Sequence, residues 1–284
     1  MKTYQTNEIK NIAIVGCSGS GKTTLTEAML YEGGIIKRRG TIEAKNTVSD
    51  YFPVEQEYGY SVFSTVFQIE QAGKKLNLID CPGADDFAGS MVSAMTVADL
   101  AMMVINGQYG VEVGTQNCYR YIRKMKKPMM FVVNQVDNEK CDYDTIIEQL
   151  QSIYGKKVVP VQYPLNAGPG FSTIVDVLLM KKLTFTGEGQ PPLVEDIPAG
   201  EIEKAKALHM ELVEKAAMRL TTPGIGGECG STLGNNRLLF QGLFLAPHTV
   251  AQALKTACFC AGMMEEMGIE TSPAWDEERS DIIQ

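Results

Sequence analysis

Short apolar runs alternate with polar and glycine-rich stretches along the first part of the chain. Residues 11–15, 101–105 and 129–133 are continuous, mainly aliphatic runs. Runs of this length are typical of strands that are buried on both faces of a parallel sheet. A glycine-rich turn and then a helical pattern over residues 23–31 follow the first run directly. The pattern predicts a strand, a loop and a helix in this order.

The remaining elements of this region complete an α/β pattern. Two β-rich runs are separated by a short connection that contains glycine, which is typical of a hairpin. Strands that alternate with helices indicate a doubly wound, mostly parallel sheet flanked by helices. We therefore predict an α/β fold with hairpin strands at residues 62–69 and 75–79, helices at 115–126 and 143–154, and a further strand at 157–161.

The pattern divides the chain into three parts. We expect a nucleotide-binding core at residues 9–164, a subdomain insertion at 165–217 and an atypical tail at 218–284. The insertion contains an apolar run at 174–185, a connector rich in glycine, proline and acidic residues at 187–198, and an amphipathic helix at 201–220.

Charge and composition limit the partners of the protein. Lys and Arg total 26 against 34 for Asp and Glu, which gives a net charge of -8. This balance gives no support for a DNA-binding or lipid-binding surface. No apolar stretch reaches the roughly 18 residues that a membrane span needs. We expect a cytoplasmic monomer without DNA or membrane partners, in which the seven cysteines are free thiols.

The turn after the first strand has the pattern G-x-x-x-x-G-K-[ST], which is typical of a phosphate-binding loop. Its glycines let backbone NH groups point at a phosphate, and the following helix adds its positive N-terminal end. Lys22 is expected to contact the β- and γ-phosphates and to act in catalysis, and the Thr23 hydroxyl to ligate Mg²⁺. The alternative is a glycine-rich turn with a surface lysine. The predicted phosphate-binding residues are Gly16, Cys17, Ser18, Gly19, Ser20, Gly21, Lys22, Thr23 and Thr24.

A second motif, Asp80-Cys81-Pro82-Gly83, ends the second hairpin strand and is followed by Ala84. Open α/β sheets bind ligands at the carboxyl ends of their strands, so Asp80 is expected to hold Mg²⁺ through water. The backbone NH of Gly83 can approach the γ-phosphate and act in catalysis. In isolation, Asp-x-x-Gly is a common turn.

A third motif, Asn134-Gln135-Val136-Asp137, follows the apolar run at residues 129–133. The carboxylate of Asp137 can accept hydrogen bonds from N1 and the exocyclic amino group of guanine, which adenine does not offer. The alternative is a polar turn between a strand and a helix. The order of the three motifs favours a guanine-binding loop.

A long polar segment at residues 34–64 lies between the first helix and the hairpin. Loops of this length within a compact domain are usually functional, which indicates a switch loop. Ser61 is the candidate for a second hydroxyl ligand of Mg²⁺, beside Thr23 and Asp80. The alternative is a solvated loop without nucleotide contacts.

Together, residues 16–24, 46–61, 80–87 and 134–137 resemble the G domain of elongation factor G, over about residues 9–215. The sequence looks closest to a diverged elongation-factor-G-like branch, with the tetracycline-resistance ribosomal protection proteins as near relatives. The resemblance implies a P-loop NTPase G domain that binds GTP and GDP, requires Mg²⁺, hydrolyses GTP and acts on the ribosome.

The sequence departs from this family at three positions. A histidine that orients the attacking water follows the Asp-x-Pro-Gly motif in the family, whereas Ala84 has only a methyl group. The base-reading motif usually has lysine where this chain has Gln135, whose stem can still lie along the base. We expect guanine preference to persist through Asp137, with weaker affinity. Residues 58–62 read Tyr-Gly-Tyr-Ser-Val in place of Arg-Gly-Ile-Thr-Ile, which keeps a hydroxyl but removes the arginine.

The tail departs further from the family, which continues with an acidic helical stretch. Codons for residues 218–223, read one base earlier, can encode the acidic run Asp-Glu-Thr-Asp-Asp-Ala. A truncated or frameshifted product is therefore one hypothesis for this part of the chain. Residues 253–267 predict a helix that contains Cys258 and Cys260, and residues 260–262 are a faint candidate for the last guanine-contact motif.

Three functions are compatible with these motifs. The first is an elongation-factor-G-like GTPase in which hydrolysis releases the switch loops. The second is a GTP-binding regulatory module that does not hydrolyse GTP, which Ala84 and Gln135 suggest. The third is a P-loop kinase for a small molecule, which shares the first motif but has no need of a guanine-binding loop.

Overall fold

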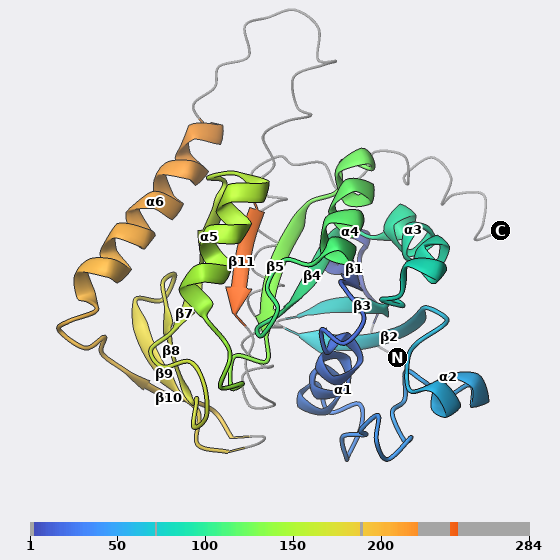
Figure 1. Ribbon diagram of the computed structural model, residues 1–284. Coiled ribbons are helices and arrows are strands. Elements are labelled where there is room, and N and C mark those ends of the chain that lie inside the picture. Colours follow the sequence, from blue (N-terminus) through green and yellow to red (C-terminus); the bar gives the residue numbers. More distant parts are fainter. Residues whose placement is uncertain (1–2, 72, 188–189, 221–238, 244–284) are drawn as a thin grey trace, which may run out of the picture.

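The computed structural model describes residues 3–71, 73–187, 190–220 and 239–243, in which strands and helices alternate (Figure 1). The strands of the main sheet are β1 (Ile9–Val15), β2 (Thr65–Gln71), β3 (Lys74–Asp80), β4 (Leu100–Asn106), β5 (Met129–Asn134), β6 (Val158–Pro160) and β11 (Leu239–Leu243). The helices are α1 (Lys22–Glu32), α2 (Pro53–Tyr58), α3 (Ala88–Val97), α4 (Val113–Lys124), α5 (Tyr143–Tyr154) and α6 (Ile202–Leu220). Short 3-10 helices occur at Thr6–Glu8 and Asp85–Phe87.

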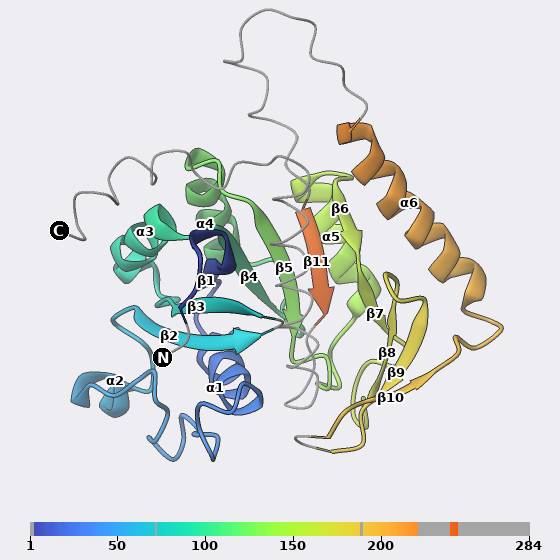
Figure 2. The ribbon, with the colours of Figure 1, turned by 180° about the vertical axis from the view of Figure 1, so that it is seen from behind.

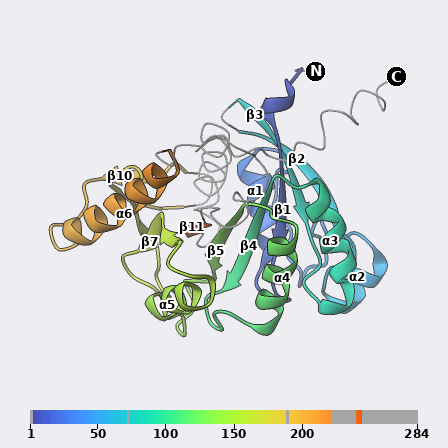
Figure 3. The same cartoon turned by 90° about the horizontal axis from the view of Figure 1, so that it is seen from above.

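The main sheet has the strand order β2-β3-β1-β4-β5-β11-β6 and is parallel except for the edge hairpin of β2 and β3. Helix α1 lies on one face of the sheet, and α3, α4 and α5 lie on the other (Figure 3). Because helices cover both faces, β4 is buried at every residue. The predicted doubly wound α/β fold is thus confirmed.

The helices and strands predicted within residues 11–161 are present, with shifted bounds. The hairpin forms as predicted, but its first strand begins at Thr65 because residues 62–64 belong to the end of the preceding loop. The segment predicted as a switch loop contains helix α2, which begins with Pro53. Proline is tolerated at the first position of a helix because the backbone NH that it lacks would have no partner within the helix. Helix α3 was not predicted from the sequence.

Strand β11 corrects the expected extent of the sheet. The sequence pattern ended the core at residue 164 and found no clear strand in the tail, yet β11 pairs in parallel with both β5 and β6. A strand that is separated from its neighbours by a long connection leaves no local alternation of strands and helices to detect. The helix predicted at residues 253–267, with its cysteines and the motif at 260–262, lies outside the described residues.

A four-stranded antiparallel sheet lies beside the main sheet and crosses the boundary at residue 164 that we predicted between core and insertion (Figure 2). Its strands are β7 (Gln162–Pro164), β8 (Thr173–Asp176), β9 (Lys181–Thr184) and β10 (Leu193–Glu195). The strand predicted at 157–161 is present as β6, one residue shorter at each end, and the chain then leaves the main sheet and enters the second sheet at β7. β10 lies within the segment predicted as a connector.

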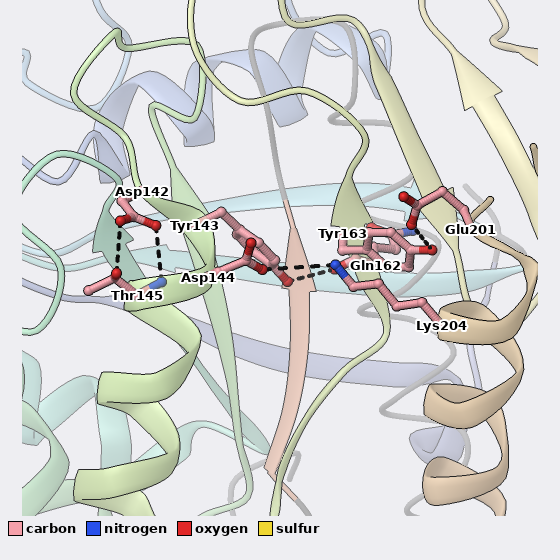
Figure 4. A network of polar contacts seen from close by, with 8 residues as sticks. All are labelled: Asp142, Tyr143, Asp144, Thr145, Gln162, Tyr163, Glu201 and Lys204. Carbon is pink, nitrogen blue, oxygen red and sulfur yellow. Dashed lines mark hydrogen bonds and ion pairs between the residues drawn. The ribbon is translucent and has the colours of Figure 1, made fainter.

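A network of polar contacts joins this second sheet to the core (Figure 4). The Tyr143 hydroxyl on α5 donates to the Gln162 carbonyl at 3.2 Å, and the Tyr163 hydroxyl donates to Glu201 at 3.1 Å. Lys204 of α6 lies 4.6 Å from the centre of the Tyr163 ring. The second sheet and α6 therefore share contacts with α5.

No helix among the described parts of the chain is long and apolar enough to cross a membrane.

Candidate functional site

The loop that is predicted to bind phosphate connects β1 to α1 at the carboxyl edge of the sheet. Gly16, Gly19 and Gly21 have φ angles of 144°, 77° and 85°, which side chains other than glycine rarely adopt. The buried Lys22 donates from Nζ to the Cys17 carbonyl at 2.8 Å, and burial lowers its pKa. Glycines at three positive φ angles and a buried lysine are the features that the motif predicts for this loop, and phosphate binding stays a prediction.

A cluster of oxygen atoms lies at the start of α1. Thr23 Oγ1 donates to Asp80 Oδ2 at 2.9 Å and lies 3.2 Å from Ser61 Oγ. Ser49, which the sequence motifs did not single out, donates to the same Asp80 oxygen at 2.6 Å. The structure thus brings together the predicted residues Thr23, Ser61 and Asp80 from three separate segments.

The donor set of this cluster fits Mg²⁺. Hydroxyl and carboxylate oxygens are the ligands that Mg²⁺ prefers, and Asp80 Oδ1 is buried without a hydrogen-bond partner. No three His, Cys, Asp or Glu residues gather into a metal site in the described part of the chain. A Mg²⁺ ion held here would use one carboxylate and two hydroxyls from the protein, and nucleotide phosphates would complete its coordination.

Burial makes the charge of Asp80 costly. Desolvation raises the pKa of Asp80 to about 6, and the hydrogen bond from Ser49 and the charge of Lys22 oppose this rise only in part. Burial likewise raises the pKa of Asp50, whose Oδ1 has no hydrogen-bond partner. A cation in this position would relieve the cost of both carboxylates.

The raised pKa predicts that Asp80→Asn stabilises the protein in the absence of nucleotide and Mg²⁺. A carboxyl with a raised folded-state pKa contributes stability below its ordinary value of 3.8, and this contribution is lost as the pH rises through about 6. At pH 7.5 we therefore expect the variant to unfold with a free energy higher by up to about 3 kcal/mol. Near pH 4 the unfolding free energies of the variant and the parent protein should be equal. Urea unfolding at both pH values measures these free energies, and a variant less stable than the parent at pH 7.5 would contradict the prediction.

Two further buried carboxylates hold the switch segment against the site, and sequence reasoning missed both. Glu27 of α1 accepts a hydrogen bond from the Gly40 backbone NH at 2.8 Å and another from the Val48 NH. Glu55 of α2 accepts from the backbone NH groups of Val62 and Phe63 at 2.9 and 3.0 Å. These contacts fix the loop on both sides of Ser49 and place Ser61 near Thr23.

The loop after Asp80 approaches the phosphate loop closely. A Cβ atom on Gly83 would lie 2.3 Å from Lys22 Nζ and 2.7 Å from the Ser18 backbone nitrogen. Only glycine fits at this position, as the motif predicts. Cys81 and Pro82 are buried. Ala84 follows in an extended conformation and offers no polar side-chain atom.

The predicted base-binding loop is tied to the phosphate loop. Asn134 Nδ2 donates to the Ser20 carbonyl at 2.9 Å, and Gln135 Nε2 donates to the Gly19 carbonyl at 3.2 Å. The Gln135 amide thus makes a direct polar contact with the predicted phosphate loop. That its stem lies along the base stays a prediction. Val136 is buried, and Asp137 is exposed at the end of β5, where a base can reach it.

The fold and the order of these motifs define a P-loop nucleotide-binding domain of the α/β class. The family model of the elongation factor Tu GTP binding domain matches residues 7–243, which is most of the chain. The chain therefore belongs to this family of translational GTPase G domains.

Relatives of known name agree with this assignment. An elongation factor G-like protein of Thermotoga maritima is 33% identical over 207 residues, covering 73% of this chain and 29% of the relative. Elongation factor G 1 of Syntrophomonas wolfei is 32% identical, with 74% and 31% covered. Peptide chain release factor 3 of Streptococcus mutans is 29% identical, with 66% and 37% covered. The chain thus spans only about a third of the length of these relatives.

A solved structure of a Thermus thermophilus protein superimposes with a TM-score of 0.77 at 29% identity. The match covers 88% of this chain and 40% of that protein. It confirms the fold. The similarity to tetracycline-resistance proteins stays a prediction.

Proposed function

We propose that this chain binds GTP and GDP with Mg²⁺ and hydrolyses GTP as the G domain of a cytoplasmic translation factor that acts on the ribosome. The observation that supports this best is the convergence of Thr23, Ser61 and Asp80 beside a phosphate loop whose other side holds Asn134 and Gln135. A site of this composition offers one end to Mg²⁺ and phosphates and the other to a guanine base.

In this proposal each residue has a distinct task. Lys22 neutralises charge on the β- and γ-phosphates, and the backbone of residues 16–21 surrounds them. Bound Mg²⁺ neutralises phosphate charge, and Thr23, Ser61 and Asp80 would hold it. Gly83 lies next to Lys22, and its backbone NH would donate to the γ-phosphate. Asp137 accepts hydrogen bonds from guanine. Loss of the γ-phosphate would release residues 49–61 from this cluster.

Ala84 favours a second candidate function, a GTP-binding module that does not hydrolyse GTP. Its methyl group cannot orient or polarise a water molecule. Release of phosphate from Mg²⁺-GTP by the purified protein, with and without ribosomes, separates the two functions. Ribosome-stimulated release supports the GTPase. Tight GTP binding without any release, with ribosomes present, would support the regulatory module.

The effect of Ala84 can be measured directly by Ala84→His. We expect the histidine to raise the rate of GTP hydrolysis on the order of 10- to 100-fold, since a positioned imidazole can orient the attacking water. Asp86→His, on an exposed residue two positions further along, is the matched control and should leave the rate unchanged. Equal rates for all three proteins would show that position 84 does not face the water.

A further inference from the structure

A cavity of about 480 Å³ lies beside the phosphate site, between α1 and the chain segment at residues 37–43. Helix α1 contributes Thr24 and Tyr31, which lie two helical turns apart on the same face. Thr24 directly follows the Lys22-Thr23 pair of the phosphate loop. The cavity therefore adjoins the nucleotide site without being part of its Mg²⁺ end.

The wall of the cavity opposite α1 is a loop that hydrogen bonds and tight packing hold in place. Glu27, from the middle of α1, accepts the hydrogen bond of the Gly40 backbone NH at 2.8 Å. A Cβ on Gly40 would lie 2.4 Å from the Asn46 carbonyl oxygen, so the chain is packed tightly here. Thr41 N donates to Asn46 Oδ1 at 2.8 Å and closes the turn that follows. These contacts give the cavity a defined shape before any ligand arrives.

The cavity is positively charged in a chain that is negative overall. Lys37, Arg38 and Arg39 line it, against the single carboxylate of Glu43. Lys37 and Arg38 are exposed, and no hydrogen bond or ion pair engages either side chain among the described residues. The hydroxyls of Thr24, Tyr31 and Thr41 add donors to the lining. Lysine and arginine side chains without an ion-pair partner, next to hydroxyl donors, are typical of sites that bind phosphate groups.

We propose that this cavity is a second anion site, which binds a phosphorylated small molecule while a nucleotide occupies the phosphate loop. Lys37 and Arg38 would contact its phosphate groups, and Thr24 would connect it to the nucleotide site. The volume fits compounds up to the size of a nucleotide.

Shape and charge favour a small molecule over an RNA backbone. The three cations are consecutive in sequence and gather around one concavity, whereas RNA contacts follow a long strand. The net charge of -8 would oppose a polyanion over most of the surface.

Pyrophosphate binding to the protein preloaded with GDP and Mg²⁺ tests the proposal, by calorimetry at constant free Mg²⁺. We expect one saturable site per chain, and a loss of affinity of at least about 10-fold in the double variant Lys37→Gln/Arg38→Gln. The control is Arg123→Gln/Lys124→Gln, which removes the same two charges from an exposed part of α4. The control should bind pyrophosphate like the parent, and thermal melting should show both variants folded.

Three results would overturn the second site. The first is no pyrophosphate binding to the GDP-loaded parent protein. The second is an equal loss of affinity in both double variants, which would indicate general charge attraction. The third is a loss confined to ribosome binding in the Lys37→Gln/Arg38→Gln variant, which would assign these cations to RNA. Since GDP binding is measured separately, failure of the second site is distinct from failure of the proposed nucleotide site.

Discussion

Replacing Lys22 by alanine should weaken GTP binding by about 100-fold or more, because it removes charge-assisted hydrogen bonds to two phosphates. The side chain is buried, donates to the Cys17 carbonyl and lies next to Gly83. Fluorescence titration with a labelled GTP analogue measures the change.

Lys124→Ala provides the control for this substitution, since Lys124 is an exposed lysine in the last turn of α4, which precedes the start of β5 and not its carboxyl end. Its GTP affinity should equal that of the parent protein. Retention of parental affinity in Lys22→Ala would show that the nucleotide does not bind in this loop.

Replacing Asp137 by asparagine should change which base the protein prefers. The amide can no longer accept two hydrogen bonds from N1 and the amino group of guanine, so GTP affinity should fall by about 100-fold. Xanthine has a carbonyl oxygen where guanine has the amino group, and the asparagine NH₂ can donate to it. Affinity for xanthosine triphosphate should therefore rise in the same variant.

Glu139→Gln is the matched control, because it removes an exposed carboxylate two residues away. It should leave both affinities unchanged. If Asp137→Asn lost GTP and xanthosine triphosphate binding alike, its effect would be structural and the base assignment would fail.

The sequence predicted those parts of the site that depend on local patterns. The phosphate loop requires glycines and a lysine at fixed spacing, and the motifs at Asp80 and Asn134 follow strands that end at one edge of the sheet. The positions of Thr23 and Asp80 relative to one another follow from that topology, whereas the position of Ser61 depends on the contacts that hold its loop. The roles assigned to them stay predictions.

The residues that sequence reasoning missed act through tertiary contacts. Glu27 bonds to backbone groups that lie 13 and 21 residues further along the chain. An acidic residue inside a helix ordinarily faces solvent, so nothing in the sequence marks it as a buried anchor. Ser49 is likewise one hydroxyl in a polar segment until the fold places it on Asp80. The length of the segment at residues 34–64 led us to predict a switch loop, which stays a prediction, whereas nothing in the sequence indicated the side chains that hold it.

Gln135 stands where the family usually has lysine, and the structure shows a contact that its amide makes. Its amide donates to the Gly19 carbonyl and keeps the base-binding loop attached to the phosphate loop without a cation. The contact is neutral and therefore weaker than one made by lysine. The expected lower affinity with the same base preference stays a prediction.

Competition between nucleotides tests the central claim most directly. The purified chain is titrated with GTP, GDP and ATP, with Mg²⁺ and with a chelator. The site described above predicts that GTP and GDP displace a labelled guanine nucleotide, that ATP does so at least about 100-fold less well, and that Mg²⁺ strengthens GTP binding. Displacement by ATP as effective as that by GTP, with or without Mg²⁺, would contradict the assignment of Asp137 to guanine and favour a P-loop kinase.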